Sequence, residues 1–569
     1  MTEFMLSPSE DATTPKRDSL IIVCGNDEFQ INRSDSFSFL YKIGAATTKG
    51  GEFLEINDSH TLNSIAEQNR DSYVEWVNSL SSIYSEYHLV EDGLSLFLLS
   101  DASCKRSELF DTFQTICNCL FLKHRLRTEI INEISIYGAN IAFAVAVESI
   151  FPTATVRSIS AKGFSGRFRN QISNGLYFLR LAGIAMANIV GSWRPSRREQ
   201  DQGDTLFFSI YPKMFSDSGL DKKYGTQVGE SDFFLITIVS DGFHQKVGLL
   251  KFLKLRRRAK SAKKILIDDQ IKLVDCLVGL YWWGRLSAFN LSIRKRKFSY
   301  KKIDISQYVH TEVCRSGDRI SRLLAFGRAL NRVLSKLQPQ SLTYYLHEYS
   351  FGRMISQIAQ SNHPVLKTYG FQHGPASWRK LVYFLGSLAS TDQQKIEQVP
   401  IPDHVFAEDV ESKSIYEYSG YRNVSLMEHV SRTDYLERFE NRMKEDHFLL
   451  VPGLHDGLAL LRFLETWLMT QPKKKFLFKP HPLANLDYVG LVHRIPNVEL
   501  TEQSVTELLS NVEAVFVTYS SLGVEALQVG RSVVVVNIPG TINESPLIDR
   551  RTKMPRGVFD FERYILNVH

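Results

Sequence analysis

Two short apolar segments near the end of the chain are each followed by residues that suit a phosphate group. A histidine beside a lysine can hydrogen-bond a phosphate and add positive charge. Two serines at the start of a helix offer hydroxyls and free backbone N–H groups at the positive end of the helix dipole. Each motif also has a structural explanation, because a loop histidine can stabilise its own turn and serine is a favoured N-cap. The residues are Lys479, His481 and Pro482 after the run 475–478, and Ser520 and Ser521 after the run 514–517.

Four further residues could act on a substrate. Asp241 and Glu348 each follow an apolar run, and a carboxylate placed there can take the proton from an attacking hydroxyl group. His373, a third catalytic candidate after another apolar run, is expected to bind the acceptor or a donor carboxylate. Glu525 lies one turn into the helix after Ser521, where it either reaches a ribose hydroxyl or is solvated. The structural alternatives are an N-cap or salt bridge for Asp241 and Glu348, and a simple turn for His373.

The elements that must position these residues are short strands that alternate with helices. The alternation occurs twice, at 204–395 and at 396–569, and it predicts two parallel sheets with helices on both faces. Two such doubly wound, Rossmann-like domains form a cleft between the carboxyl ends of their strands. Residues 19–200 are expected to form an accessory N-terminal α/β domain with a linker, after a disordered tail at 1–18. The predicted fold class is α/β, with an acceptor domain at 204–395 and a donor domain at 396–569.

The composition is that of an ordinary globular protein, since 43% of the 569 residues are hydrophobic and 23% are charged. The net charge of +6 is too small to indicate a nucleic-acid binder, although it permits a local basic patch. The six cysteines include no CxxC pair, which argues against a disulfide framework or a zinc site and favours the cytoplasm. No run approaches the ~20 apolar residues of a membrane-spanning helix, and we expect no secretory signal.

Two basic runs, 251–264 and 294–302, flank an apolar stretch that contains Tyr281, Trp282 and Trp283. One interpretation is a pair of solvated helix faces around a core helix. The other is a patch that touches anionic lipid, because basic residues beside interfacial aromatic rings suit a membrane surface. The second interpretation predicts peripheral contact with the inner face of a membrane through 251–302.

The order of the C-terminal motifs resembles that of one group of bacterial enzymes. KPHP at 479–482, followed by the Ser-Ser turn with EAL behind it, is similar to GT-B glycosyltransferases that use CMP-activated nonulosonates or Kdo. This group includes bacterial sialyltransferases and capsule or O-antigen transferases. The resemblance implies that His481, Ser520 and Ser521 hold the phosphate of a nucleotide-sugar donor, which is a substrate rather than a cofactor. The absence of a DxD motif predicts a site without a metal, in which helix N-termini and basic side chains replace it.

Three further segments, 205–215, 344–354 and 369–384, look like a family of surface-carbohydrate biosynthesis proteins. Sialyltransferases also have an acidic motif that supplies a base, but Glu91-Asp92-Gly93 lies far from the predicted cleft and is expected to form a turn. The resemblances imply a glycosyltransferase that moves a nonulosonic acid or Kdo onto a lipopolysaccharide, a capsule or another surface glycan, free or lipid-linked. The alternatives are a CDP-glycerol-type polyol-phosphate transferase and an inactive GT-B scaffold in a glycan-assembly complex.

Overall fold

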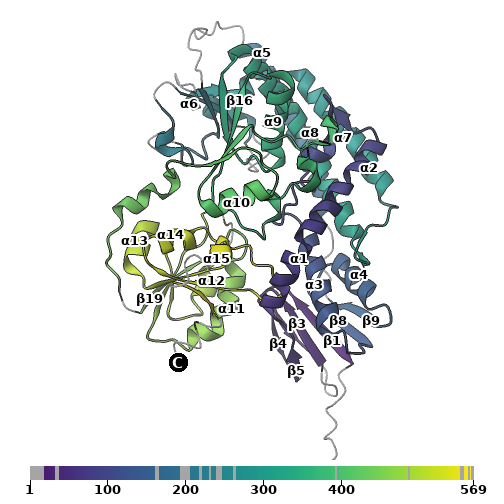
Figure 1. The fold of residues 1–569 in the computed structure, drawn as a ribbon, viewed down its shortest axis with the longest axis vertical. Helices are drawn as coiled ribbons and strands as arrows, with labels where there is room; N and C mark the ends of the chain where they lie inside the picture. The colour runs from purple at the N-terminus through teal and green to yellow at the C-terminus, as the bar shows by residue number, and fades with distance from the viewer. Residues whose placement is uncertain are drawn as a thin grey trace, which may run out of the picture.

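Three parallel sheets organise the protein, whose structure is a computed structural model (Figure 1). In Figure 1 the first unit, in purple and blue, lies at lower right, the middle unit, in teal and green, lies above, and the last unit, in yellow-green, lies at lower left. The predicted α/β fold class, with doubly wound sheets and an additional N-terminal unit, is confirmed. The described residues are 18–31, 38–50, 52–159, 166–191, 205–216, 219, 221–229, 232–238, 247–259, 264–390, 392, 394–444, 446–482, 484, 487–550, 557–561 and 564.

The first unit contains a sheet in which all neighbouring strands are parallel. Between β6 (Val90–Glu91) and β7 (Leu94–Ser95), Asp92 and Gly93 have positive φ angles and form the turn that the sequence predicts. A second small pair joins β2 (Glu28–Gln30) and β4 (Thr47–Lys49). The strands of the main sheet are, in spatial order, β5 (Phe53–Glu55), β3 (Ser38–Ile43), β1 (Ser19–Cys24), β8 (Glu133–Tyr137) and β9 (Thr155–Ile159), and the helices are α1 (Ser59–Ser79), α2 (Ser81–Glu86), α3 (Thr112–Arg125) and α4 (Ile141–Ile150).

The middle unit is built on a seven-stranded parallel sheet. Its longest helix is α8 (Ser306–Leu337), which packs against α7 and α9. A hairpin of β13 (Ser299–Tyr300) and β14 (Ile303–Asp304) precedes this helix. The strands are, in spatial order, β12 (Lys264–Leu266), β11 (Phe233–Thr237), β10 (Thr205–Ile210), β15 (Ser341–Tyr345), β16 (Lys367–Phe371), β17 (His404–Ala407) and β18 (Val424–Leu426), and the other helices are α5 (Gly166–Gly191), α6 (Leu249–Ala259), α7 (Leu273–Ile293), α9 (Ser350–Asn362) and α10 (Val410–Tyr418).

The last unit is built on a six-stranded parallel sheet of short, buried, β-branched and aromatic strands. Local sequence fixes the start of α13, where Ser504 and Glu507 form a reciprocal capping box. The strands are, in spatial order, β21 (Val498–Leu500), β20 (Lys475–Phe478), β19 (His447–Val451), β22 (Ala514–Val517), β23 (Ser532–Val535) and β24 (Val558–Asp560), and the helices are α11 (Gly457–Met469), α12 (Val489–Val492), α13 (Val505–Asn511), α14 (Leu522–Gln528) and α15 (Pro546–Arg550).

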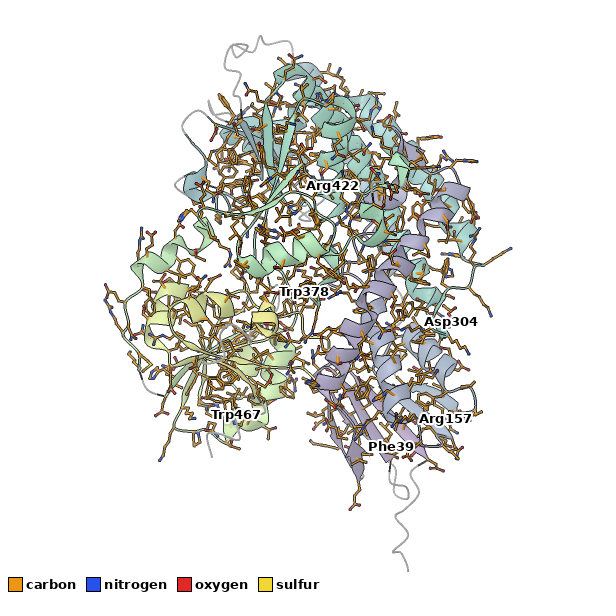
Figure 2. The ribbon with its side chains drawn as sticks, in the orientation of Figure 1. Phe39, Arg157, Asp304, Trp378, Arg422 and Trp467 are labelled. Carbon is orange, nitrogen blue, oxygen red and sulfur yellow. The ribbon has the colours of Figure 1, made fainter. Side chains whose placement is uncertain are left out.

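The first and middle units share one hydrophobic core, whereas the last unit has separate cores on the two faces of its sheet. Figure 2 shows Trp378 near the centre of the molecule, where the Arg70 guanidinium of α1 lies 5.2 Å from the centre of its ring. Trp467 lies inside the last unit in the same view, and its ring packs against Phe476 and Phe561. The chain therefore forms two lobes, one from the first and middle units together and one from the last unit.

Two predicted domain boundaries need correction. β17 and β18 fall within 396–569, but they pair in parallel with the middle sheet next to β16, so the last sheet begins only at β19. α5 falls within 19–200, yet its Phe178 ring packs directly against Gly279 of α7 in the middle unit. In the sequence, strand–helix alternation looks the same whether the strands belong to one sheet or to two. Backbone pairing, which the pattern does not show, decides which sheet a strand joins. Among the described helices, none is both long and apolar enough to span a bilayer.

Candidate functional site

The sheet of the last unit has a topological switch point between β19 and β22. The chain passes from β19 to β20 and β21 on one side, and then crosses to β22, β23 and β24 on the other. The loops after β19 and β22 therefore diverge and leave a crevice, which is where doubly wound sheets bind ligands. His455 and Asp456 come from the first loop, and Thr518 and Tyr519 come from the second.

The sheet of the first unit has the same arrangement, with its switch point between β1 and β8. Gly25 and Asn26 follow β1, and Gly138 and Asn140 follow β8. Gly138 has a φ of +72°, and a Cβ atom there would lie 2.4 Å from the carbonyl oxygen of Cys24. Glycine is therefore required for the two loops to approach one another at this edge.

The two switch points face one cavity with a volume of about 560 Å³. Loops of the first sheet line one side and loops of the last sheet line the other, while α8 and Lys380 of the middle unit complete the wall. The predicted cleft between carboxyl ends of parallel strands is thus present. Its facing sheets are those of the first and last units, and not those of the middle and last units as the sequence suggested.

Hydrogen bonds between the first and last units close one end of this cavity. The backbone N–H of Gly44 donates to the carbonyl oxygen of Pro539 at 2.9 Å. The Gln114 side chain donates to the carbonyl oxygen of Gly540 at 2.8 Å and accepts from the N–H of Ile542 at 2.7 Å. The loop after β23 is therefore held directly against the first unit.

Charged residues from all three units meet at the cavity wall. Lys380 Nζ lies 3.1 Å from Glu108 Oε1, and the Tyr349 hydroxyl donates to the same oxygen at 3.2 Å. Burial would raise the pKa of Glu108, but the positive charges of Lys380 and Arg106 outweigh it and lower the pKa to about 2. Glu108 is therefore an ionised partner that keeps Lys380 charged.

Glu544, in the loop after β23, differs from Glu108 in its protonation. Burial raises the pKa of Glu544 to about 7, although the charge of Lys380 and a hydrogen bond from Ser107 oppose the shift. Burial likewise raises the pKa of Asp456, at the other side of the last unit's switch point, to about 6. Asp456 occupies the N-cap position of α11, but its carboxylate makes no capping hydrogen bond to that helix. Both carboxylates line the cavity and can exchange a proton near neutral pH.

The predicted phosphate residues lie on the expected edge of the last sheet. The KPHP loop follows β20 and the Ser-Ser turn follows β22, and these strands flank β19 on either side. His481 is half-buried, and burial, followed by the positive charges of His455 and Lys223, lowers its pKa. Because Lys223 belongs to the middle unit, His481 lies close to the junction of the two lobes. A phosphate role for this set remains a prediction.

The remaining members of that set differ in their surroundings. Lys479 Nζ donates to the carbonyl oxygen of Gln503 at 2.6 Å, and Pro482 is exposed. Ser521 occupies the N-cap position of α14 without a side-chain cap, and the N–H of Leu522 donates to Ser520 Oγ at 3.4 Å. The hydroxyl of Ser521 therefore makes no capping bond to its own helix.

Glu525 is neither a solvated helix residue nor an open carboxylate. It is buried in α14, pairs with the Arg432 guanidinium and accepts a hydrogen bond from the Tyr435 hydroxyl. Arg432 also binds Glu408 of the middle unit at 2.9 Å, so this network joins the two lobes. The solvated alternative is wrong because the segment between the lobes covers this face of α14. The ribose contact remains a prediction, and it would compete with Arg432.

His373 lies at the end of β16, as predicted, beside the junction of the lobes. Its carbonyl oxygen accepts from Lys223 Nζ at 3.4 Å, and within the described part of the chain no hydrogen-bond partner lies near its Nδ1. Burial and the positive charges of Lys223 and Lys380 hold its pKa well below the usual value. His373 is therefore a neutral imidazole among cations, although it does not line the large cavity.

The structure does not bring Glu348, one of the two predicted bases, to the cavity. Glu348 is 1% exposed and accepts a hydrogen bond from the Tyr416 hydroxyl, and it is absent from the described cavity wall. Its position directly after β15 is as predicted, but neighbouring aromatic rings cover it. Asp241 lies outside the described residues.

Sequence reasoning missed the charged residues of the cavity wall, among them Glu108, Lys380, Asp456 and Glu544. Asp456 had a usable signal, because it comes shortly after the apolar run 448–451, at the edge where ligands bind. The other three come from loops without a motif. Among the described residues, no group of three histidine, cysteine or acidic side chains is placed to hold a metal ion.

No protein-family model and no curated protein matches the chain. The solved structures with partial likeness to it include the following three. UDP-N-acetylglucosamine 2-epimerase from Rickettsia bellii is 10% identical, with 62% of this chain and 88% of that chain covered and a TM-score of 0.31. The calicheamicin glycosyltransferase CalG4 is 12% identical (63% and 86% covered, TM-score 0.34), and a variant of the wall teichoic acid polymerase TagF is 10% identical (66% and 79% covered, TM-score 0.27). The strand orders given above, and not these likenesses, define the fold.

Proposed function

We propose that this chain is a GT-B-like glycosyltransferase whose two substrates meet in the cavity between the first and last units. One observation supports this above all: the switch points of two parallel sheets, where such sheets bind ligands, face each other across a single cavity. The last unit binds the nucleotide-activated donor. The first unit, rather than the middle unit, then holds the glycan acceptor.

The donor phosphate is placed beside His481, Ser520 and Ser521. These residues do not line the described cavity wall, but Ser520 directly follows Tyr519 of that wall. They flank the loop after β19 on the donor-side edge, and Lys223 lies close enough to His481 to lower its pKa. A phosphate there would receive hydrogen bonds and lie near positive charge, which is the environment that a leaving nucleotide needs when no metal is present. The C-terminal motifs favour a CMP-activated nonulosonic acid or Kdo as the donor.

The reaction needs a base that reaches the acceptor, and the cavity offers Glu544, whose loop in the last unit lies against the first unit. The acceptor hydroxyl oxygen forms a bond to the anomeric carbon while the bond from that carbon to the phosphate oxygen of CMP breaks. The bonding electrons remain on the phosphate, and the hydroxyl proton passes to the Glu544 carboxylate. A carboxyl pKa of about 7 suits this role at neutral pH, and Lys380 beside it stabilises the ionised form. Glu544 thereby replaces Glu348 and Asp241 in the mechanism, while His373 remains a candidate for orienting a substrate carboxylate.

Isothermal titration with CMP, CDP and UDP tests the donor site, with His481→Ala as the probe variant. We expect CMP to bind best, and the variant to bind it more weakly by ~1.5–3 kcal/mol, the value of one hydrogen bond to a charged group. His493→Ala is the matched control, because His493 is an exposed histidine of the same unit that lies at the end of α12 and follows no strand of the sheet. Equal CMP affinity in the His481 variant and the wild type would remove His481 from the donor site.

The nucleotide preference also separates the alternatives. Tightest binding of CDP would favour a polyol-phosphate transferase, and no binding of any nucleotide at millimolar concentration would favour an inactive scaffold. If the protein transfers a sugar from a CMP-activated donor, incubation with CMP-N-acetylneuraminate or CMP-Kdo should release CMP faster when a glycan acceptor is added. We further propose that the protein acts at the inner face of a membrane, where lipid-linked glycans are assembled.

A further inference from the structure

α5 presents a row of apolar side chains outward. Leu176, Leu179, Met186 and Val190 are separated by three, seven and four positions, a spacing that places them on one face of a helix. All four are exposed, with exposed fractions of 72% for Leu179 and 73% for Val190. The opposite face of the helix is the buried one and includes Phe178 and Ile184. A soluble helix normally has polar residues where this row lies.

α7 repeats the pattern. Its inner face buries Trp282, Leu286 and Phe289, while Leu277, Leu280, Tyr281 and Leu291 are exposed on the outer face. The exposed fraction of Leu277 is 65%. This arrangement corrects the expected aromatic anchor, because Trp282 points into the core and only Tyr281 of the aromatic trio is fully exposed.

The two apolar rows belong to neighbouring helices. The Phe178 ring of α5 packs against Gly279 of α7, and the residues next to this contact, Leu179 and Leu280, are exposed. Leu249 at the start of α6 lies against Gly183 of α5, and the next residue, Leu250, is exposed. Figure 1 places α5 and α6 at the upper end of the molecule, with α7 beside them and the last unit at the opposite end.

Basic residues border this apolar surface, and acidic residues are sparse. On α6 the exposed charged side chains are Lys251, Lys254, Arg257 and Arg258, and the helix has no acidic residue. Arg294, Lys295 and Lys297, at the end of α7, are also exposed. The acidic residue inside α7, Asp275, is buried and paired with Arg328 and Arg332.

We propose that the outer faces of α5 and α7, bordered by α6, form a docking surface for an anionic lipid bilayer. Leucine, valine, methionine and tyrosine side chains would enter the boundary between headgroups and acyl chains, while the lysines and arginines bind the anionic headgroups. The charge on this border is predominantly positive, although Glu86 pairs with Arg296 and Asp269 pairs with Arg256. A mainly basic border complements an anionic lipid surface better than a protein surface of mixed charge. The proposed surface includes α5 in addition to the segment 251–302. The two basic runs in the sequence did not indicate that α5 takes part.

Sedimentation with phosphatidylglycerol–phosphatidylcholine vesicles tests the proposal. The full chain should bind at low salt, and binding should weaken as salt rises or when phosphatidylglycerol is left out. The double variant Leu179→Glu with Leu277→Glu should lower the partition coefficient at least about tenfold, because two apolar side chains no longer enter the bilayer. Ile130→Glu with Val365→Glu is the matched control, since these residues are 64% and 85% exposed and lie on other elements.

Three results would overturn the proposal. The wild type could fail to bind anionic vesicles at low salt, or the control variant could lose as much binding as the test variant. Alternatively, light scattering could show a dimer that the Leu179–Leu277 variant abolishes, which would identify a second copy of the chain as the occupant. Titration of the test variant with CMP should match the wild type, which shows that the chain is folded and separates this test from that of the donor site.

Discussion

The switch points of the first and middle sheets have the same topology, but one is open and the other is covered by protein. In both, the chain begins at a central strand, adds strands on one side and then crosses to the other. The first sheet's edge opens into the large cavity. The middle sheet's edge, where Glu348 follows β15, is filled by protein.

The filling segment comes from the first unit and spans residues 98–108. Arg353 donates to the carbonyl oxygen of Leu98 at 3.1 Å and to Ser103 Oγ at 2.7 Å. Tyr349, the residue after Glu348, donates to Glu108 at 3.2 Å. A doubly wound sheet therefore offers a possible site at its switch point, and neighbouring packing decides whether the site stays open.

The largest effect that would sharpen this comparison is on catalysis in the large cavity, into which the first sheet's edge opens. We expect Glu544→Gln to slow CMP release from a CMP-activated donor by a factor on the order of 10²–10⁴, because glutamine accepts no proton. CMP affinity should change little. Glu502→Gln, an exposed substitution in the same unit, serves as the control. Unchanged turnover in the Glu544 variant would remove it as the base.

The next effect concerns the segment that seals the middle sheet. Arg353→Ala removes a buried side chain and both of its bonds to 98–108, so we expect a loss of about 3–5 kcal/mol in unfolding free energy. Ser103→Ala, which removes one of these bonds, should lose about 1 kcal/mol. Urea denaturation measures both, with the exposed Arg422→Ala as control. Equal stability of the Arg353 variant and the control would contradict the sealing role.

A pH-dependent effect should appear at the open edge. Burial raises the pKa of Glu312, on the cavity wall, from 4.5 to about 8. The folded state then holds a proton that the unfolded state releases, so stability should fall as pH rises from 4.5 to about 8, by up to about 1.4 kcal/mol per unit of pH. Glu312→Gln resembles the protonated acid and should flatten this slope in urea denaturation at several pH values. An unaltered slope would show that Glu312 is ionised in the folded protein.

The smallest effect is expected at the filled edge of the middle sheet, after β15. Glu348→Gln can still accept a hydrogen bond from Tyr416, so unfolding free energy should fall by no more than about 1–2 kcal/mol and CMP release should be unchanged. The same assay that tests Glu544 measures it. If this variant lost turnover and the Glu544 variant kept it, the base would lie at the middle sheet as the sequence suggested, and the contrast between the two edges would fail.

Much of the secondary structure could be predicted because short apolar runs and turn residues are local signals. The apolar runs 475–478 and 514–517 match β20 and β22. The position of His481 and Ser520 on one sheet edge also followed from the sequence, since each comes directly after a strand of a parallel sheet.

Other features depended on which surfaces pack together. Glu348 and Asp456 both come shortly after an apolar run, yet one is enclosed by Tyr416 and the other lines the cavity. Glu108, Lys380 and Glu544 are far apart in sequence, and no local pattern joins them.

The sequence by itself determined the strands, the parallel sheets and the polar residues at their carboxyl ends, because backbone geometry and hydrophobic periodicity act over a few residues. Only the tertiary structure decided that the first unit faces the last one, that the middle switch point is filled and that Glu544 lies beside Lys380. These outcomes depend on surfaces that belong to segments hundreds of residues apart in the sequence. The free energy gained by burying such surfaces depends on how the whole chain packs.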